Sequence, residues 1–386
     1  MLISFICVIC VLFFFIMKVK FLDLKSQYLS IKEEIDGAIQ KVLLDSAFTD
    51  GPYVKEFEKN FALMHNAKYC VAVNSGTAAL HASLMALEIK AGDEVIVPAN
   101  TFFSTPLSVT LTGATPVFVD CESEYYNIAV DKIQNAITKN TKAIITVHLY
   151  GQPSKLDEIK AIADKNNLFL IEDCAQAHIA KYKEGFVGNF GKCGCFSFYC
   201  GKNLGAYGEG GAIITNDETL YEKLLMIRNI GMSRKYYHDL IGHNYRMSGM
   251  QGAILDVKLK HLDEWTDARR KNADLYRRYL ADCSEIILPN EMDNIKHVYH
   301  LFVIRTKKRD KLRHFLDNNQ IQTGIHYPIP CHLQKAYDYL NYKIGDFLIT
   351  DKLANEIISL PMSEQLKEEE IRYVSWKIKE FFSNRV

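Results

Sequence analysis

The chain has 386 residues, and its 46 Lys and Arg residues balance its 46 Asp and Glu residues, so the formal net charge is zero. Hydrophobic residues make up 48% and charged residues 24%, which is typical of a folded globular protein and excludes a largely disordered or collagen-like chain. The neutral balance gives no sign of general nucleic-acid binding, and the length predicts two or three domains, or one large domain with a smaller partner.

The first residues form a membrane-like stretch, because residues 1–17 carry no charge and are almost entirely apolar. Their number is at the short end for a membrane-spanning helix. Lys18 and Lys20 follow the run, so an inserted segment would leave the rest of the chain in the cytoplasm. Two interpretations stay open: residues 1–16 are a membrane anchor, or the protein begins at Met17 and the upstream stretch extends the reading frame. Both predict a cytoplasmic body.

The first helix signal after this stretch opens at Ser30, which forms an S-x-x-E capping box with Glu33. The buried face of this helix is predicted by apolar residues at helical spacing, namely Ile31, Ile35, Ile39 and Val42. Two further helical patterns cover about residues 54–65 and 77–89.

Apolar, strand-like runs alternate with helical patterns after the turn at residues 50–52. They lie at about 94–97, 116–119, 143–148, 168–171, 195–199 and 211–215. Because these runs are apolar on both sides of the strand period, they predict a sheet that is covered on both faces. The alternation predicts an α/β fold with a largely parallel sheet, in which ligands collect at the carboxyl ends of the strands.

A long helix is predicted to begin at about residue 250. Its buried face is marked by Leu255, Leu259 and Leu262, with Lys258, Lys260 and Asp263 between them. The remaining residues mix short strands and helices. We therefore predict a large domain over residues 17–265, which includes the N-terminal helix, and a smaller C-terminal α/β domain over residues 266–386.

The ten cysteines mostly lie inside apolar runs, where a free cysteine behaves as a small hydrophobic residue. This distribution is typical of a reducing compartment and not of a disulfide framework. Cys7 with Cys10 and Cys193 with Cys195 form close pairs. Neither pair has partners at metal-site spacing, so we predict no metal site.

Three polar features follow predicted strands. A hydroxyl-rich turn at residues 74–80 leads into a helix N-terminus, which favours phosphate. Asp173 follows one apolar run, and Lys202 follows another in a glycine-rich loop that lets backbone approach a ligand closely. Each of these features is common by itself, because an acidic residue often lies in a turn, a lysine is usually solvated and a hydroxyl-rich turn often begins a helix. In this order they are the parts needed to hold pyridoxal phosphate (PLP).

The wording of these motifs resembles the DegT/DnrJ/EryC1/StrS family of sugar aminotransferases, which are PLP enzymes of the aspartate aminotransferase fold, fold type I. The resemblance extends from about Met17 to the C-terminus, which favours Met17 as the start. It rests on Gln27 and on residues 21–24, 75–77, 98–102, 172–178, 196–199, 201–205, 208–211, 244–247 and 324–328.

The resemblance implies a role for each residue around the cofactor ring. Lys202 is implied to bond covalently to PLP and to move the proton during amino-group transfer. Asp173 is implied to keep the pyridine nitrogen protonated, so that the ring acts as an electron sink. Phe102 is implied to stack on the ring, and Gln176 to contact its 3-hydroxyl group.

Other residues are implied to hold the cofactor phosphate. Gly76, Thr77 and Ser197 resemble the phosphate cradle, with Ser197 five residues before Lys202 as in the family. Asn244 resembles a residue that reaches the phosphate across a dimer interface. The resemblance therefore implies a homodimer with shared active sites.

A loop near the C-terminus resembles one that helps to hold the sugar in relatives. His326 and Tyr327 are its implied substrate-binding residues, and a simple turn before Pro328 is the alternative interpretation. Ile179 departs from the family, which commonly has glycine there, and predicts a reshaped turn near the cofactor.

The implied function is a PLP-dependent aminotransferase that converts a nucleotide-linked keto-deoxysugar to an amino sugar, with L-glutamate as donor and 2-oxoglutarate as its product. Residues 247–253 and 324–330 resemble members that act on dTDP-3-oxo-6-deoxyhexoses. The alternatives are a 4-aminotransferase on a UDP-, GDP- or dTDP-4-keto sugar, a PLP-dependent sugar dehydratase and a non-catalytic regulator. Lys202 argues against the dehydratase, because that branch has histidine in its place. The presence of Lys202, Asp173 and Ser197 together argues against a non-catalytic regulator, which need not keep them.

Overall fold

The computed structural model describes residues 17–383. The predicted N-terminal segment, residues 1–16, lies outside the described residues, so its two interpretations stay predictions. Within residues 17–383, no helix has both the length and the apolar character needed to cross a membrane. Every cysteine in this part of the chain is unpaired.

The helices and strands follow one another along the chain as the α/β alternation predicts. The helices are α2 (Leu24–Ser30), α3 (Lys32–Leu44), α4 (Pro52–Met64), α5 (Gly76–Ala86), α6 (Ser104–Leu111), α7 (Val130–Ala136), α8 (Leu156–Lys165), α9 (Glu218–Arg228), α10 (Gly249–Leu259), α11 (Leu262–Leu280), α12 (Arg309–Asn318), α13 (Leu348–Glu356) and α14 (Glu368–Ser383). The strands are β1 (Tyr69–Val73), β2 (Glu94–Pro98), β3 (Thr115–Val119), β4 (Thr141–Val147), β5 (Phe169–Asp173), β6 (Lys181–Tyr182), β7 (Gly185–Phe186), β8 (Cys193–Ser197), β9 (Gly211–Thr215), β10 (Met232–Arg234), β11 (Tyr237–His238), β12 (Ile295–Lys296), β13 (Phe302–Arg305) and β14 (Ile357–Leu360).

A seven-stranded sheet in the order β1-β9-β8-β5-β4-β2-β3 forms the centre of the molecule. Neighbouring strands pair in parallel from β8 to β3, whereas β9 runs antiparallel to both β1 and β8. The mostly parallel sheet predicted from the sequence is therefore confirmed. All six predicted strand runs match strands of this sheet.

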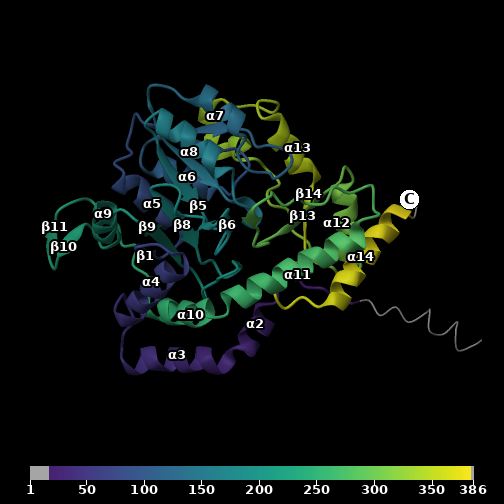
Figure 1. Cartoon of the computed structure of the whole chain (residues 1–386), viewed down its shortest axis with the longest axis horizontal. Helices are drawn as coiled ribbons and strands as arrows, with labels where there is room; N and C mark the ends of the chain where they lie inside the picture. Colours follow the sequence, from purple (N-terminus) through teal and green to yellow (C-terminus); the bar gives the residue numbers. More distant parts are fainter. Residues whose placement is uncertain (1–16, 384–386) are drawn as a thin grey trace, which may run out of the picture.

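Helices cover both faces of the sheet, as the apolar character of the strands requires (Figure 1). Val95 and Val97 of β2 pack into one core with α5, α6 and α9, and Ile96 between them packs with α7 and α8 on the opposite face. Helices α4 and α10 cover the half of that opposite face that contains β1, β9 and β8.

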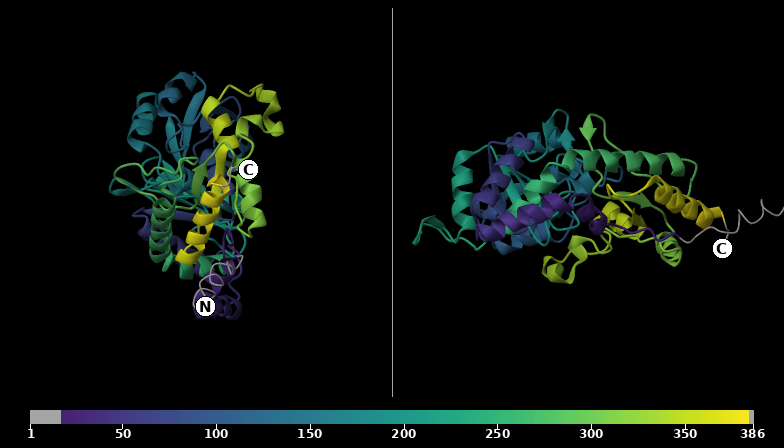
Figure 2. Two further views of the ribbon diagram at one scale, coloured as in Figure 1. Left: turned by 90° about the vertical axis from the view of Figure 1, so that its right-hand side faces the viewer. Right: turned by 90° about the horizontal axis from the view of Figure 1, so that it is seen from below.

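The C-terminal part has a core of its own, in which α11, α12 and α14 pack around the two-stranded sheet β13–β14. Val19, near the start of the described chain, joins this core and pairs with Ile321. The predicted boundary between residues 265 and 266 falls inside α11, and the division into two domains stays a prediction. The β10–β11 hairpin projects from one end of the molecule, and α14 lies at the other (Figures 1 and 2).

The predicted capping box at Ser30 is wrong. Ser30 is the last residue of α2, and its hydroxyl donates to the Gln27 carbonyl at 2.8 Å. The side chain of Asp23 caps α2 instead, and α3 starts at Lys32 without a side-chain cap. The pattern misled because a short helix directly precedes the longer one, so that the hydroxyl closes the first helix.

The predicted long helix from residue 250 is broken between α10 and α11 at Lys260 and His261. Leu255, Leu259 and Leu262 are buried as predicted. Lys258, placed by the pattern between these buried positions, is wholly buried. Its ammonium donates to the Gly205 carbonyl at 2.6 Å and lies 4.7 Å from the centre of the Tyr207 ring.

Candidate active site

A cavity of about 740 Å³ opens at the carboxyl ends of the parallel strands. Its walls come from the segments that follow β1, β2, β5 and β8, which is where the sequence predicts a ligand. The predicted site residues that line it are Gly76, Thr77, Phe102, Asp173, Gln176, Ser197, Lys202 and His326. Asn244 and Tyr327 are predicted site residues that do not line it.

Lys202 lies in the loop after β8, where its backbone N–H donates to the Tyr199 carbonyl at 2.8 Å. The loss of hydration lowers the pKa of Lys202 to about 8, although the nearby Asp173 carboxylate acts in the opposite direction. At pH 7 roughly a tenth of such lysines are uncharged. A neutral amine is a nucleophile, so this lysine is prepared to attack a carbonyl group.

Asp173 is the last residue of β5, and its side chain is buried. The carboxylate accepts hydrogen bonds from the Thr105 hydroxyl at 2.8 Å and from the Ala175 N–H at 3.1 Å. Burial raises the pKa of Asp173, whereas both hydrogen bonds and Lys202 lower it. A cationic ring nitrogen beside this carboxylate would favour its ionised form. Thr105 was not predicted, although it lies in the hydroxyl-rich segment that follows the predicted strand at 94–97.

The turn from β1 into α5 has the features of an anion cradle. The Ser75 side chain accepts from the Ala78 N–H at 3.1 Å, and the Thr77 hydroxyl donates to Ser104 at 2.8 Å. A Cβ atom at Gly76 would lie only 2.6 Å from that of Ser197, so glycine alone lets the two segments approach this closely. The α5 N-terminus and these hydroxyl groups therefore converge where a phosphate group would bind.

Gln176 joins the ring site to the predicted sugar loop. Its side-chain oxygen accepts from the Tyr150 N–H at 2.6 Å, and its side-chain nitrogen donates to the Tyr327 hydroxyl at 3.1 Å. Tyr327 in turn lies beside Phe102, with 5.5 Å between the ring centres. The His326 ring shares a hydrogen bond with Ser359 at 2.8 Å. The loop thus contacts the cavity wall at several points.

Asn244 is exposed and does not line the cavity, although it lies beside the residue that precedes the phosphate turn. Its backbone pairs with Asn229, and its carbonyl accepts from the Asn74 side chain at 3.4 Å. An exposed position outside the cavity of its own chain is compatible with a contact to the site of a second subunit. That role stays a prediction.

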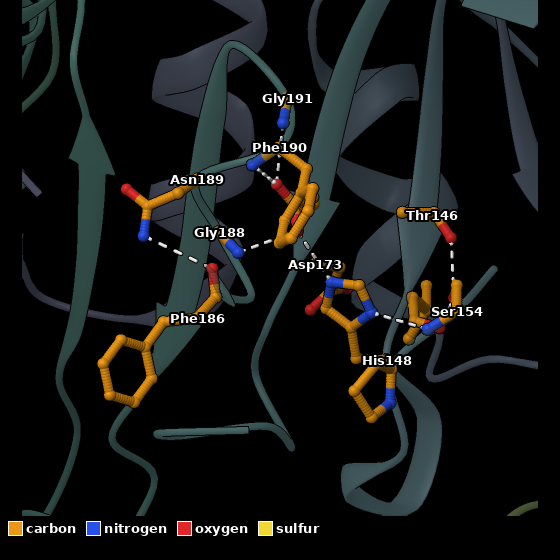
Figure 3. Close-up of polar contacts among 12 residues, drawn as sticks. Thr146, His148, Ser154, Asp173, Phe186, Gly188, Asn189, Phe190 and Gly191 are labelled. Carbon is orange, nitrogen blue, oxygen red and sulfur yellow. Dashed lines mark hydrogen bonds and ion pairs between the residues drawn. The ribbon is translucent and has the colours of Figure 1, made fainter. Parts of the chain in front are cut away.

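A buried network stands behind Asp173 (Figure 3). The Glu172 carboxylate accepts from the backbone N–H groups of residues 188, 190 and 191 and lies 3.0 Å from His148 Nε2. The other His148 nitrogen accepts from the Ser154 N–H at 3.0 Å. Cys174 completes a group close enough to hold a metal ion, but the Glu172 and His148 atoms already have partners. We interpret the network as a support for the strand end.

Ile179, the departure from the family pattern, adopts a left-handed backbone with φ of 54°. This conformation suits glycine and strains a β-branched residue. The side chain is buried in the core that also contains Phe196 and Phe198, so packing compensates for the strain.

The buried Lys258, whose ammonium donates to the Gly205 carbonyl in the loop that contains Lys202, can be tested through the pH dependence of protein stability. Its pKa is lowered by burial from 10.5 to about 8, so between these values the unfolded chain binds more protons than the folded chain. Relative to Lys258→Met, the free energy of unfolding of the wild type should therefore rise by about 2 kcal/mol from pH 8 to pH 10. Urea denaturation measures it. The matched variant Lys260→Met, at an exposed position, should show no such pH-dependent difference.

Comparisons with known proteins agree with this geometry. The family model of the DegT/DnrJ/EryC1/StrS aminotransferase family matches residues 29–379. A pleiotropic regulatory protein of Geobacillus stearothermophilus is 45% identical over 368 residues, covering 95% of this chain and 99% of that protein. A dTDP-3-amino-3,6-dideoxy-α-D-galactopyranose transaminase of Aneurinibacillus thermoaerophilus is 44% identical, covering 92% and 97%.

A comparison with solved structures also finds a sugar aminotransferase. The crystal structure of DesV of S. venezuelae in complex with a ketimine intermediate superimposes with a TM-score of 0.93 and 40% sequence identity. The match covers 96% of this chain and 99% of that chain.

Proposed function

We propose a specific reaction for this chain, which belongs to the DegT/DnrJ/EryC1/StrS aminotransferase family of PLP-dependent nucleotide-sugar aminotransferases with fold type I. The proposed reaction is amination of carbon 3 of a dTDP-linked 3-oxo-6-deoxyhexose with L-glutamate as donor. The observation that carries the proposal is one cavity that is shared by Lys202, Asp173 and the phosphate turn. The similar transaminase of A. thermoaerophilus supports the choice of carbon 3, because its name refers to a 3-amino sugar.

The cavity fits PLP by its donor set. The close approach of Gly76 to Ser197 leaves a cradle for the phosphate, and Asp173 supplies a buried carboxylate for a protonated ring nitrogen. Phe102, which is 53% exposed, offers a ring face for stacking. PLP, when bound, supplies the electron sink and carries the amino group between donor and sugar.

The residues of this chain supply binding and proton transfer. We assign the nucleophilic amine to Lys202 Nζ, which then holds and returns the proton that moves during amino-group transfer. The Thr105 and Ala175 hydrogen bonds favour the charged form of Asp173 against the effect of burial, and this carboxylate would hold a protonated ring nitrogen. The pKa of His326 falls to about 4 through burial, so at neutral pH the ring is uncharged, and the nitrogen that does not bond Ser359 can face a sugar.

Glutamate as donor and a homodimer are parts of the same proposal. Asn244 would then complete the phosphate site of the second subunit. The exposure of this residue outside its own cavity supports the assignment.

The two half-reactions test the function separately. PLP-loaded protein is mixed first with L-glutamate and then with dTDP-linked 3-oxo- or 4-oxo-6-deoxyhexose, and the absorbance of the cofactor is followed. Glutamate should convert the cofactor to its amino form, and the 3-oxo sugar alone should restore the starting spectrum. Restoration by the 4-oxo sugar alone would keep the family and overturn the choice of carbon. No change with any common amino donor would contradict amination.

A further inference from the structure

His300 is a cavity-lining residue to which the motifs assign no role. It precedes β13 and lines the same cavity as Lys202 and His326. Its backbone carbonyl accepts a long hydrogen bond of 3.5 Å from buried Arg269, which also binds the carbonyls of Tyr299 and Met362. The backbone that carries this imidazole is therefore held by contacts from α11.

The protonation of the His300 ring is determined by Asn203, the residue next to Lys202. Asn203 is buried, and its side-chain nitrogen donates to the Val298 carbonyl at 2.9 Å. Because a carbonyl can only accept, the nitrogen of Asn203 must face it, and the side-chain oxygen faces the other way. That oxygen lies 3.2 Å from His300 Nδ1. Nδ1 must therefore carry the proton, and Nε2 has a free lone pair.

The lone pair on His300 Nε2 is available to a ligand. Within residues 17–383 this nitrogen has no hydrogen-bond partner. It is also not one of the buried atoms that lack a partner because protein encloses them. Burial and the nearby positive charge of Lys202 hold the pKa of His300 well below its usual value, so the ring stays neutral. The cavity thus contains an uncharged acceptor close to the reacting lysine.

We propose that His300 is a substrate-contacting residue whose Nε2 accepts a hydrogen bond from a hydroxyl group of the sugar, with Asn203 fixing the tautomer. This inference rests on the proposed function. The chemistry favours the sugar over the amino donor, because a lone pair attracts a hydroxyl hydrogen and repels the carboxylates of glutamate. His300 therefore contributes to the sugar half-reaction and leaves the glutamate half-reaction unchanged.

Two conservative variants separate the two ring nitrogens. His300→Asn can keep the donor to Asn203 but lacks an acceptor at the position of Nε2. His300→Gln can present its side-chain oxygen at the position of Nε2 but loses the donor to Asn203. Loss of one neutral hydrogen bond should weaken sugar binding about three- to tenfold in His300→Asn. His300→Gln should stay within about twofold of the wild type, since the acceptor is restored.

The measurement uses PLP-loaded wild type and both variants. Calorimetry gives the Kd for dTDP-3-amino-3,6-dideoxy-α-D-galactopyranose and for dTDP alone, and single-turnover absorbance gives the rate with glutamate. The inference requires weaker binding of the sugar nucleotide by His300→Asn, recovery in His300→Gln, and unchanged dTDP binding and glutamate rate in both.

Other outcomes overturn it. Equal sugar affinity in all three proteins would show that Nε2 does not touch the sugar. A loss that extends to dTDP or to the glutamate rate would assign the effect to the cofactor site or to Lys202. If the wild type itself fails to bind or convert any sugar nucleotide, the proposed function fails, which this series distinguishes from a failure of His300 alone.

Discussion

Replacement of Lys202 with alanine is expected to remove the covalent attachment of PLP and to slow amino-group transfer from glutamate by more than about 10⁴-fold. The reason is that Lys202 Nζ is proposed both as the nucleophile and as the group that moves the proton. Its pKa of about 8 makes it suited to both tasks near neutral pH. Single-turnover absorbance with glutamate measures the rate.

Borohydride reduction of the PLP-loaded protein, followed by peptide mapping, tests the attachment directly. The label should be found on the peptide that contains Lys202 and should be absent from Lys202→Ala. Lys192→Ala is a matched control, because Lys192 is exposed and lies just before the same strand, β8. Equal labelling of Lys202→Ala and the wild type would assign the cofactor to another lysine.

The sequence predicted that a ligand would bind at the carboxyl ends of the strands. Polar residues follow several of the predicted strands, and a largely parallel sheet brings such ends to one edge. Asp173 at the end of β5, Ser197 at the end of β8 and Gly76 after β1 meet around one cavity for this reason. These residues could be predicted because motif spacing and strand periodicity can both be read from short segments of sequence.

Contacts between distant segments were not predictable in this way. Lys258 binds the Gly205 carbonyl across 53 positions of the chain, and Thr105 binds Asp173 across 68. Helical periodicity predicts that a lysine such as Lys258 faces solvent, because no residue of its own helix indicates a buried carbonyl partner. Similarly, the tautomer of His300 depends on Asn203, which is 97 positions away.

Asp173→Asn is expected to slow amino-group transfer about 10²–10³-fold while the fold is retained. The asparagine oxygen can still accept from the Ala175 N–H, and the Thr105 hydroxyl can turn to accept from the new amide nitrogen. What is lost is the negative charge that we propose for the partner of the ring nitrogen. Thr105→Val removes a hydrogen bond and keeps the charge, so it should cost much less than Asp173→Asn.

The same substitution should change the pKa of Lys202 in a definite direction. In the cofactor-free protein the Asp173 charge favours the lysine ammonium and opposes the effect of burial. Without that charge, the pKa should fall below its wild-type value of about 8. The rate of PLP attachment, which needs the neutral amine, should then reach its midpoint at a lower pH. A midpoint at higher pH would contradict the assignment.

The two effects of Asp173→Asn together separate the role of the charge from general damage to the site. A distorted cavity would slow both PLP attachment and amino-group transfer. Loss of the charge alone makes the Lys202 amine available at lower pH, yet it slows the transfer, because the ring nitrogen no longer has a carboxylate to keep it protonated. Faster attachment below pH 8 combined with slower turnover is therefore the result that assigns Asp173 to the cofactor ring.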